Sequence, residues 1–323
     1  MNWDARSCVV AVIALGLMLP TSSPSAAGIQ ALKVPADGPL PVLSGAVWYP
    51  CAAPPTAMQV GPFPVLAAKD CPVDGKNLPL IVMSHGRTGS FLANRDTAQV
   101  LADAGFVVAA ISHPGDNAQD GSRSSELSAF VDRPADMKRL VDYVVGSWGH
   151  AGAIDATRIG FFGFSRGGYT GLVVVGAEPR FDAAVGMCKE QTSAICKEVR
   201  RGSLPPLVHD SRVKAAVIAD PLSIFFTKTS FNEVWVPIQL WRSERGGDSV
   251  TPRSVDTVAE ELPSPPDFRA VSNSQHFSFL PPCPAEIARD APEICSDPPG
   301  FDREAFHKQF NAEVLAFFRK ILQ

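Results

Sequence analysis

The chain has 323 residues, of which 46% are hydrophobic and 19% are charged, and its formal net charge at pH 7 is −4. This acidic balance, without any basic run, argues against a nucleic-acid-binding protein, because phosphate binding needs a concentrated positive surface. The length is ample for one large α/β domain.

The N-terminal segment has the features of a secretory signal peptide. A short polar start precedes an apolar run from Cys8 to Leu19, and Ser25-Ala26-Ala27 forms a small-residue cleavage site. The run is too short for a membrane span, although Asp4 is unusual in a leader and leaves an uncleaved anchor as the alternative. We predict a signal peptide over residues 1–27, one domain over residues 28–323, no membrane span in the mature chain, and a secreted or periplasmic location.

Cysteine usage agrees with export. Loss of the leader removes Cys8 and leaves six cysteines, which allow many connectivities. The alternatives to disulfides are free thiols or a metal site, but no C-x-x-C spacing occurs, so no metal is predicted. Pairing of sequence neighbours is our prediction and would clip three loops: Cys51 with Cys71, Cys188 with Cys196, and Cys283 with Cys295.

The first half of the mature chain alternates short apolar runs with segments of helical spacing. A short β-branched run that ends in turn residues is typical of a buried parallel strand, and Leu78–Ser84 is the clearest case. The Pro-rich stretch Ala52–Asp74 is predicted to be a loop excursion. The other predicted elements are strands at Ile29–Val34 and Leu43–Tyr49, a helix at Asn94–Ala104, a strand at Phe106–Ile111 and a helix at Pro134–Ser147.

Gly163-Phe164-Ser165-Arg166-Gly167 is the most informative motif. It follows a strand-like run, Arg158–Phe162, and precedes a small-residue segment, Gly168–Val174, that can begin a helix. A strand, G-x-S-x-G and a helix form the nucleophile elbow of α/β-hydrolases. The serine must stand on a sharp turn, and a bulky side chain at either motif glycine would crowd the flanking elements. We therefore predict Ser165 as a nucleophile.

The chain after the elbow alternates less regularly. Gly186–Arg212 is predicted to be an excursion over the site, and Pro281–Gly300 a second clipped loop. The pattern as a whole predicts an α/β-hydrolase fold, with a mostly parallel central sheet, helices on both faces and extra disulfide-clipped loops. The remaining predicted elements are the sixth strand at Val213–Ala219, the seventh at Val234–Trp241, a helix at Ser254–Leu262, a short last strand at Phe268–Val271 and a helix at Arg303–Leu322.

Serine is a weak nucleophile, so Ser165 needs a general base and an orienting carboxylate. In this fold the order along the chain is Ser, then Asp or Glu, then His. His276 lies just past the last predicted strand and is the predicted base. His85 and His113 follow earlier strands and could neighbour the pocket, but chain order disfavours them as the base.

Two carboxylates compete for the third position. Asp248 lies beyond the seventh predicted strand in a D-x-x-x-P turn and is our first choice. Asp220, which ends the sixth strand, is the alternative acid, and Glu244 is a weaker third candidate. The Asp that is not used would cap a turn or a helix.

An oxyanion hole needs two N–H groups aimed at the developing negative charge. One is expected from Arg166, the residue after the nucleophile, and the other from Arg87 in the loop His85–Gly89. The alternative for this loop is a plain strand-to-helix turn. The Arg87 and Arg166 side chains could attract an acidic or phosphate-bearing substrate, or could form solvent-exposed salt bridges.

Four short segments, taken in order over most of the mature chain, resemble a known group. That group is the secreted bacterial α/β-hydrolases related to platelet-activating-factor acetylhydrolase, often called dienelactone-hydrolase-like. The segments are Val47-Trp48-Tyr49-Pro50, Ser84-His85-Gly86, Gly163-Phe164-Ser165-Arg166-Gly167-Gly168 and His276-Phe277.

The resemblance implies hydrolysis of short acyl esters without a cofactor, with Ser165 as nucleophile and His276 as base. The acetylhydrolase branch places the acid after the sixth strand, which favours Asp220, whereas the broader superfamily places it after the seventh, which favours Asp248. True dienelactone hydrolases use a cysteine nucleophile, and this chain has a serine there. Dienelactone itself is therefore not the expected substrate.

The sequence thus predicts a secreted serine carboxylester hydrolase that acts on short-to-medium acyl esters through a Ser-His-Asp triad and an acyl-enzyme. Its partner would be a small-molecule ester, with no cofactor, metal or nucleic acid, and the sequence does not indicate an oligomeric state. Two alternatives stay open. One is a peptidase or amidase on the same triad, and the other is a catalytically silent binding protein with this fold.

Overall fold

The computed structural model describes residue 1 and residues 26–182, 194–201 and 206–323. Nearly all of the predicted signal peptide lies outside these residues, as does part of the predicted excursion Gly186–Arg212, including Cys188. The division at residues 27 and 28 therefore stays a prediction. Of the described helices, none combines the length and apolar composition needed to cross a bilayer.

The core is built on one sheet of ten strands. They are β1 (Ala26–Val34), β2 (Leu43–Cys51), β3 (Thr56–Val60), β4 (Phe63–Lys69), β5 (Leu78–Ser84), β6 (Val107–Ser112), β7 (Ile154–Phe164), β8 (Val213–Ala219), β9 (Ile238–Ser243) and β10 (Asp267–Val271).

The strands lie side by side in the order β10-β9-β8-β7-β5-β6-β2-β1-β4-β3. From β10 to β6 every pair is parallel, and β2 then joins β6 in antiparallel register. β1 pairs antiparallel with β2 and parallel with β4, and β3 closes the edge antiparallel to β4. The predicted fold class, with its mostly parallel sheet, is confirmed.

The helices of the described chain connect these strands and cover the sheet. They are α1 (Arg95–Asp103), α2 (Ser128–Gly146), α3 (Arg166–Val174), α4 (Ala194–Arg201), α5 (Pro252–Glu261), α6 (Ala285–Asp290), α7 (Pro292–Cys295) and α8 (Arg303–Leu322), with short 3₁₀ turns η1 (Ala151–Ala153), η3 (Lys228–Phe231) and η4 (His276–Phe279).

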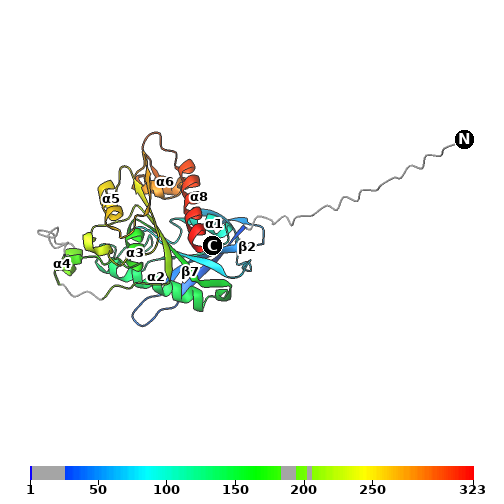
Figure 1. The fold of residues 1–323 in the computed structure, drawn as a ribbon, viewed down its shortest axis with the longest axis horizontal. Coiled ribbons are helices and arrows are strands. Elements are labelled where there is room, and N and C mark those ends of the chain that lie inside the picture. Colours follow the sequence, from blue (N-terminus) through cyan, green and yellow to red (C-terminus); the bar gives the residue numbers. More distant parts are fainter. Residues whose placement is uncertain (2–25, 183–193, 202–205) are drawn as a thin grey trace.

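Alternate residues of the buried strands face two hydrophobic layers, as the two-residue period of a strand requires. In β5, Leu80 and Val82 join the layer that includes buried residues of α2, α3 and α5, whereas Ile81 and Met83 join the layer that includes those of α1 and α8. Figure 1 accordingly shows α2 beside α3, and α1 beside α8. The helices thus cover both faces, and the carboxyl ends of the parallel strands are left to carry a site.

Several elements differ from the sequence prediction. The predicted seventh strand, Val234–Trp241, is β9, which begins only at Ile238, and the predicted loop Pro281–Gly300 contains α6 and α7. The predicted excursion Ala52–Asp74 contains the hairpin β3–β4, in which Gly61 adopts a positive φ of 56° at the turn. Such a backbone conformation suits glycine and permits a tight connection. α2 begins at Ser128, six residues before Pro134, which lies inside the helix. Phe130 and Val131 are buried in the first turns, and this packing outweighs the preference of proline for a helix start.

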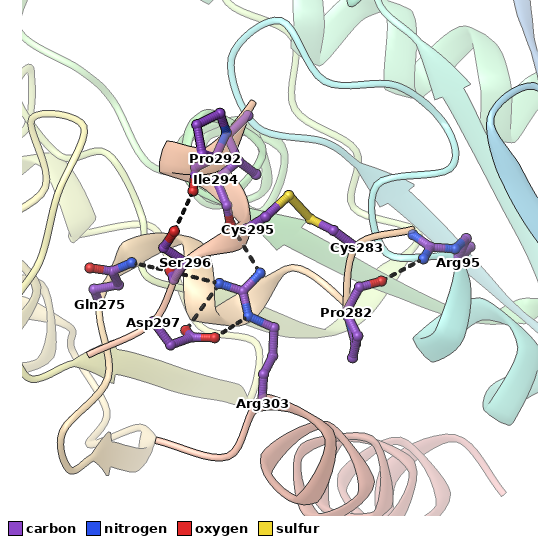
Figure 2. Close-up of a disulfide and its surroundings, with 10 residues drawn as sticks. All are labelled: Arg95, Gln275, Pro282, Cys283, Pro292, Ile294, Cys295, Ser296, Asp297 and Arg303. Atoms are coloured by element: carbon purple, nitrogen blue, oxygen red, sulfur yellow. Dashed lines mark hydrogen bonds and ion pairs between the residues drawn. A yellow bond between two sulfur atoms is a disulfide. The ribbon is translucent and has the colours of Figure 1, made fainter. Parts of the chain in front are cut away.

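Two of the predicted disulfides are confirmed. Cys51 and Cys71 are bonded with a Cα–Cα distance of 6.3 Å, and Cys283 and Cys295 with one of 5.7 Å. Figure 2 shows the second bond beside Arg303, which binds Asp297. Cys196 is also disulfide-bonded, but its predicted partner lies outside the described residues.

Candidate active site

Ser165 occupies the sharp turn between β7 and α3. Its backbone has φ 56° and ψ −118°, a conformation that L-residues rarely adopt and that tends to occur at functional sites. The turn is fixed by neighbours, because the Ser165 amide donates to the Ala219 carbonyl at 2.9 Å and the Ser165 carbonyl accepts from the Leu222 amide at 3.0 Å. The backbone strain is therefore held by β8 and the segment that follows it.

The glycines of the motif are required by close backbone contacts. A Cβ atom at Gly163 would collide with the Gly167 carbonyl oxygen, and one at Gly167 would collide with the Ser84 carbonyl oxygen. At Gly168 a Cβ would lie 2.9 Å from the Pro221 Cβ. Helix α3 can therefore approach β5 and β7 closely only because these positions lack side chains.

His276 lies within hydrogen-bond distance of Ser165. Its Nε2 atom is 2.9 Å from the Ser165 Oγ, and its Nδ1 atom is 2.7 Å from the Asp220 Oδ2. A carboxylate only accepts hydrogen bonds, so the proton of the neutral ring resides on Nδ1 and Nε2 is free to accept from the serine hydroxyl. The His276 ring also packs on Phe164, with ring centroids 4.7 Å apart.

Asp220 is the carboxylate that contacts His276. It follows β8 directly with a φ of 44° and is fully buried. Its Oδ1 accepts from the Ser243 amide at 2.8 Å, and its Oδ2 accepts from the Ser243 hydroxyl at 2.8 Å. These bonds compensate a carboxylate that would otherwise be costly to bury.

Asp248, our first choice from the sequence, lies elsewhere. Residues 246–249 all have positive φ values, so the chain after β9 curls back. Gly247 then lies so close to His276 that a Cβ added to it would be 3.1 Å from the His276 Cβ. This turn leaves Asp248 one-third exposed, with its Oδ1 atom 3.9 Å from a terminal nitrogen of Arg87. The structure thus brings the alternative acid, Asp220, to His276 in place of Asp248.

The loop after β5 lies directly beside the nucleophile. A Cβ at Gly86 would stand 3.3 Å from the Ser165 Cβ, so the Gly86–Arg87 peptide borders the serine. Arg166 begins α3, and the first N–H groups of a helix have no partner within the helix. Both expected oxyanion donors are therefore placed next to Ser165.

The two arginine side chains differ in environment. The Arg87 side chain is half exposed, and its ion pair within the described part of the chain is the long contact to Asp248. The Arg166 guanidinium is buried, binds Asp116 Oδ2 at 2.8 Å and the Ser124 carbonyl at 2.8 Å, and stacks over Phe130 at 4.5 Å. Arg166 thus does not form a solvent-exposed salt bridge, because its guanidinium is buried and is bound by Asp116 and the Ser124 carbonyl.

A buried polar network that the sequence interpretation did not identify lies beneath these loops. Arg133, from α2, donates to the carbonyls of His85 and Gly86, and its Nε lies 3.0 Å from Asp116 Oδ2. His113 bridges the Ser84 hydroxyl at 2.9 Å and Asp136 at 3.1 Å. The one sequence signal for it was that His85 and His113 each follow a strand end.

Burial governs the ionisation of this network. Desolvation, with help from the Arg133 charge, lowers the pKa values of His85 and His113 well below the ordinary value, so both rings are neutral. Desolvation also raises the pKa of Asp136 to about 7. Over the described ranges, no cluster of three His, Cys, Asp or Glu side chains is arranged to hold a metal ion.

Comparisons with known proteins give one family match and a similar solved structure. The sequence model of the prolyl oligopeptidase family matches residues 93–188, which run from just before α1 past the elbow. Among solved structures, a ferulic acid esterase from Streptomyces cinnamoneus is similar, with a TM-score of 0.67 and 20% identity over 93% of this chain and 91% of that chain. A search of the curated proteins finds no match.

A likeness at this level of identity shows a shared fold and not a shared substrate. The chain therefore has the α/β-hydrolase fold, as its sequence predicted, and the matched family segment contains the elbow with Ser165.

Proposed function

We propose that the protein is a serine carboxylester hydrolase that acts on short-to-medium acyl esters through Ser165, His276 and Asp220. The observation that carries the proposal is the continuous hydrogen-bonded chain from the Asp220 carboxylate through the His276 ring to the Ser165 hydroxyl. This is the arrangement that activates a serine for attack on a carbonyl. The structural likeness to a ferulic acid esterase supports the choice of an ester.

In the acylation step, Ser165 Oγ attacks the ester carbonyl carbon while His276 Nε2 takes the hydroxyl proton. The amides of Arg87 and Arg166 stabilise the negative oxygen of the tetrahedral intermediate. Collapse of the intermediate breaks the bond to the alcohol, which leaves with the proton from His276 Nε2. Asp220 accepts from Nδ1 throughout, which orients the ring and stabilises its positive charge.

In the deacylation step, water replaces the alcohol. His276 Nε2 removes a proton from the water as it attacks the acyl-enzyme, and the proton then returns to Ser165 as the acid product leaves. None of these proposed steps uses a cofactor or a metal.

The proposed location of the enzyme is the periplasm or the outside of the cell. The disulfides Cys51–Cys71 and Cys283–Cys295 favour an oxidising compartment, in agreement with the signal peptide predicted over residues 1–27. The enzyme would thus meet small-molecule esters in the periplasm or outside the cell.

A peptidase or amidase is the second candidate, because the prolyl oligopeptidase family model matches residues 93–188. The match covers less than a third of the chain and includes neither Asp220 nor His276. The proposed triad alone serves either reaction, and amides are the harder substrates because amines leave less readily.

The test is a panel of p-nitrophenyl esters from acetyl to long acyl chains, with methyl ferulate and a p-nitroanilide, on the mature protein and on the Ser165→Ala variant. We expect short-to-medium esters to react fastest and the variant to lose at least ~10⁴-fold in kcat. Faster turnover of the anilide than of any ester would establish the peptidase alternative. Equal rates in both proteins would refute the serine mechanism.

A further inference from the structure

Arg133 is a fully buried arginine that reaches from α2 to the loop after β5. Only 1% of its side chain is exposed. One terminal nitrogen donates to the His85 carbonyl at 2.7 Å, and the other donates to the Gly86 carbonyl at 3.1 Å. A single guanidinium thus binds two successive carbonyls of the loop that borders Ser165, a task that suits the rigid planar fork of arginine.

The bond from Arg133 to the Gly86 carbonyl helps to set the direction of the next amide. In a trans peptide the C=O and N–H groups point in opposite directions. The Gly86 carbonyl accepts from Arg133 at 3.1 Å, from His85 Nδ1 at 2.6 Å and from the Gly89 amide at 3.2 Å, so the Arg87 N–H faces the opposite way. A Cβ at Gly86 would lie 3.3 Å from the Ser165 Cβ, so this peptide borders the nucleophile.

Asp116 holds this arginine charged and connects it to the second donor. Burial alone would raise the pKa of Asp116, but the Arg133 and Arg166 guanidinium groups outweigh burial and lower it below its ordinary value. Desolvation lowers the pKa of Arg133 to about 10, so the side chain keeps its charge at neutral pH. Asp116 also accepts from the Thr88 amide at 3.1 Å, which fixes the loop from its other end.

We propose that Arg133 is a positioning residue that aims the Arg87 N–H at the oxyanion of the transition state. Asp116 is its counter-charge and ties it to Arg166, the residue that supplies the second donor. Arg133 touches no substrate and acts through the Gly86–Arg87 peptide. The inference rests on the proposed ester hydrolysis at Ser165.

The test compares Arg133→Lys with Arg139→Lys. Arg139 is a matched control because it lies on the same helix and also donates to two carbonyls, those of Pro35 and Pro41, which do not belong to the loop after β5. Its ion pair with Asp136, at 3.6 Å, is one that a lysine can also form. Each protein is assayed on an oxygen ester and on the corresponding thionoester, whose C=S sulfur accepts hydrogen bonds poorly and so gains little from an oxyanion hole.

Loss of one oxyanion donor costs ~10²–10³-fold in kcat, and a misdirected donor should cost ~10–100-fold. We therefore expect Arg133→Lys to lower kcat on the oxygen ester by that factor, with KM within about 2-fold. Because the thionoester gains little from the oxyanion hole, the ratio of ester to thionoester rates in Arg133→Lys should fall at least about 10-fold below the wild-type ratio. Arg139→Lys should leave both quantities unchanged.

Three outcomes would overturn the inference. The first is an unchanged ester-to-thionoester ratio in Arg133→Lys while Ser165-dependent activity persists, which leaves the proposed function standing. The second is loss of the fold in both Arg133→Lys and Arg133→Gln, seen by thermal unfolding, because it would assign Arg133 to stability. The third is a wild-type protein without Ser165-dependent hydrolysis, with which the proposed function and this inference fail together.

Discussion

At the scale of single residues, the two candidate acids differ in their partners, because Asp220 binds His276 and Asp248 pairs with Arg87. Asp220 accepts from the Ser243 amide and hydroxyl and from His276. Asp248 makes one long contact at the surface, and exposed pairs of this kind contribute under about 1 kcal/mol. The two Asp residues therefore have separable effects on rate.

The prediction is that Asp220→Asn lowers kcat by ~10³–10⁴-fold, because an amide in place of the carboxylate favours the wrong tautomer of His276 and cannot stabilise the imidazolium. Asp248→Asn should stay within about 3-fold of wild type. The measurement is kcat on p-nitrophenyl acetate for both variants. A large loss in Asp248→Asn with a small loss in Asp220→Asn would reverse the assignment of the acid.

Asp136 gives a prediction for stability against pH. Desolvation raises its pKa from 3.8 to about 7, so between these values the folded state keeps a proton that the unfolded state has released. The stability contributed by this group therefore falls as pH rises toward 7. Relative to wild type, Asp136→Asn should gain about 3 kcal/mol in free energy of unfolding between pH 5 and pH 8.

Urea unfolding at several pH values measures that gain. Asp142→Asn is the control on the same helix, because Asp142 is half exposed and its pKa, which burial would raise, is lowered by Lys138 and Arg212. A lowered pKa affects stability only below the ordinary value of an Asp, so this variant should show no trend over the same range. Parallel curves for Asp136→Asn and wild type would contradict the raised pKa.

At the scale of elements, the elbow is a contact between backbones. β7, α3 and the end of β5 meet where Gly163 and Gly167 leave no room for a Cβ. The placement of Ser165 at a positive φ follows from this packing, since the Ala219 carbonyl and the Leu222 amide hold the turn from β8. A side chain at either glycine would therefore disturb the packing of α3 on β5 and β7, in addition to any effect on catalysis.

Gly167→Ala is predicted to destabilise the protein by more than about 3 kcal/mol, or to prevent folding, because the added methyl meets the Ser84 backbone, which cannot move without β5. Gly146→Ala is the matched control. Its added methyl, at the end of α2, meets nothing within 4 Å, and alanine favours a helix. Thermal unfolding and soluble yield measure both variants, and equal stability would contradict the packing argument.

The loop clipped by Cys283 and Cys295 supports the turn that carries His276. Ser278 donates to Asp297 at 2.7 Å, and Gln275 donates to the Ser296 carbonyl. Figure 2 shows Gln275, Ser296 and Asp297 gathered around Arg303 beside the disulfide. Cys295 therefore directly precedes the residues, Ser296 and Asp297, that hold the η4 turn.

Replacing both Cys283 and Cys295 by Ser should cost about 3 kcal/mol in stability and lower kcat severalfold per folded molecule. The control replaces Cys51 and Cys71, which should cost about as much stability with kcat unchanged. Cys51 ends β2, which runs antiparallel to β6, so it lies at the edge of the sheet opposite the site. An equal effect of the two double variants on kcat would contradict a positioning role for the second clip.

At the scale of the whole molecule, local patterns predicted the sheet, the elbow and two disulfides, because strand runs and turn glycines act over short stretches of chain. The choice between Asp220 and Asp248 depended on contacts across 56 residues and on the curled turn at 246–249, which no local pattern reveals. The role of Arg133 could not be predicted from local patterns for the same reason, since its partners lie 17 to 48 residues away along the chain. The edge hairpin β3–β4 was missed because its prolines resemble those of a loop.

The most direct test of the central claim is covalent labelling by a fluorophosphonate, with the modified residue identified by peptide mass spectrometry. The account predicts a single label on Ser165 in wild type and in Asp248→Asn, slow labelling in Asp220→Asn and His276→Ala, and none in Ser165→Ala. A label on another residue, or a labelling rate that does not depend on Asp220 and His276, would contradict it.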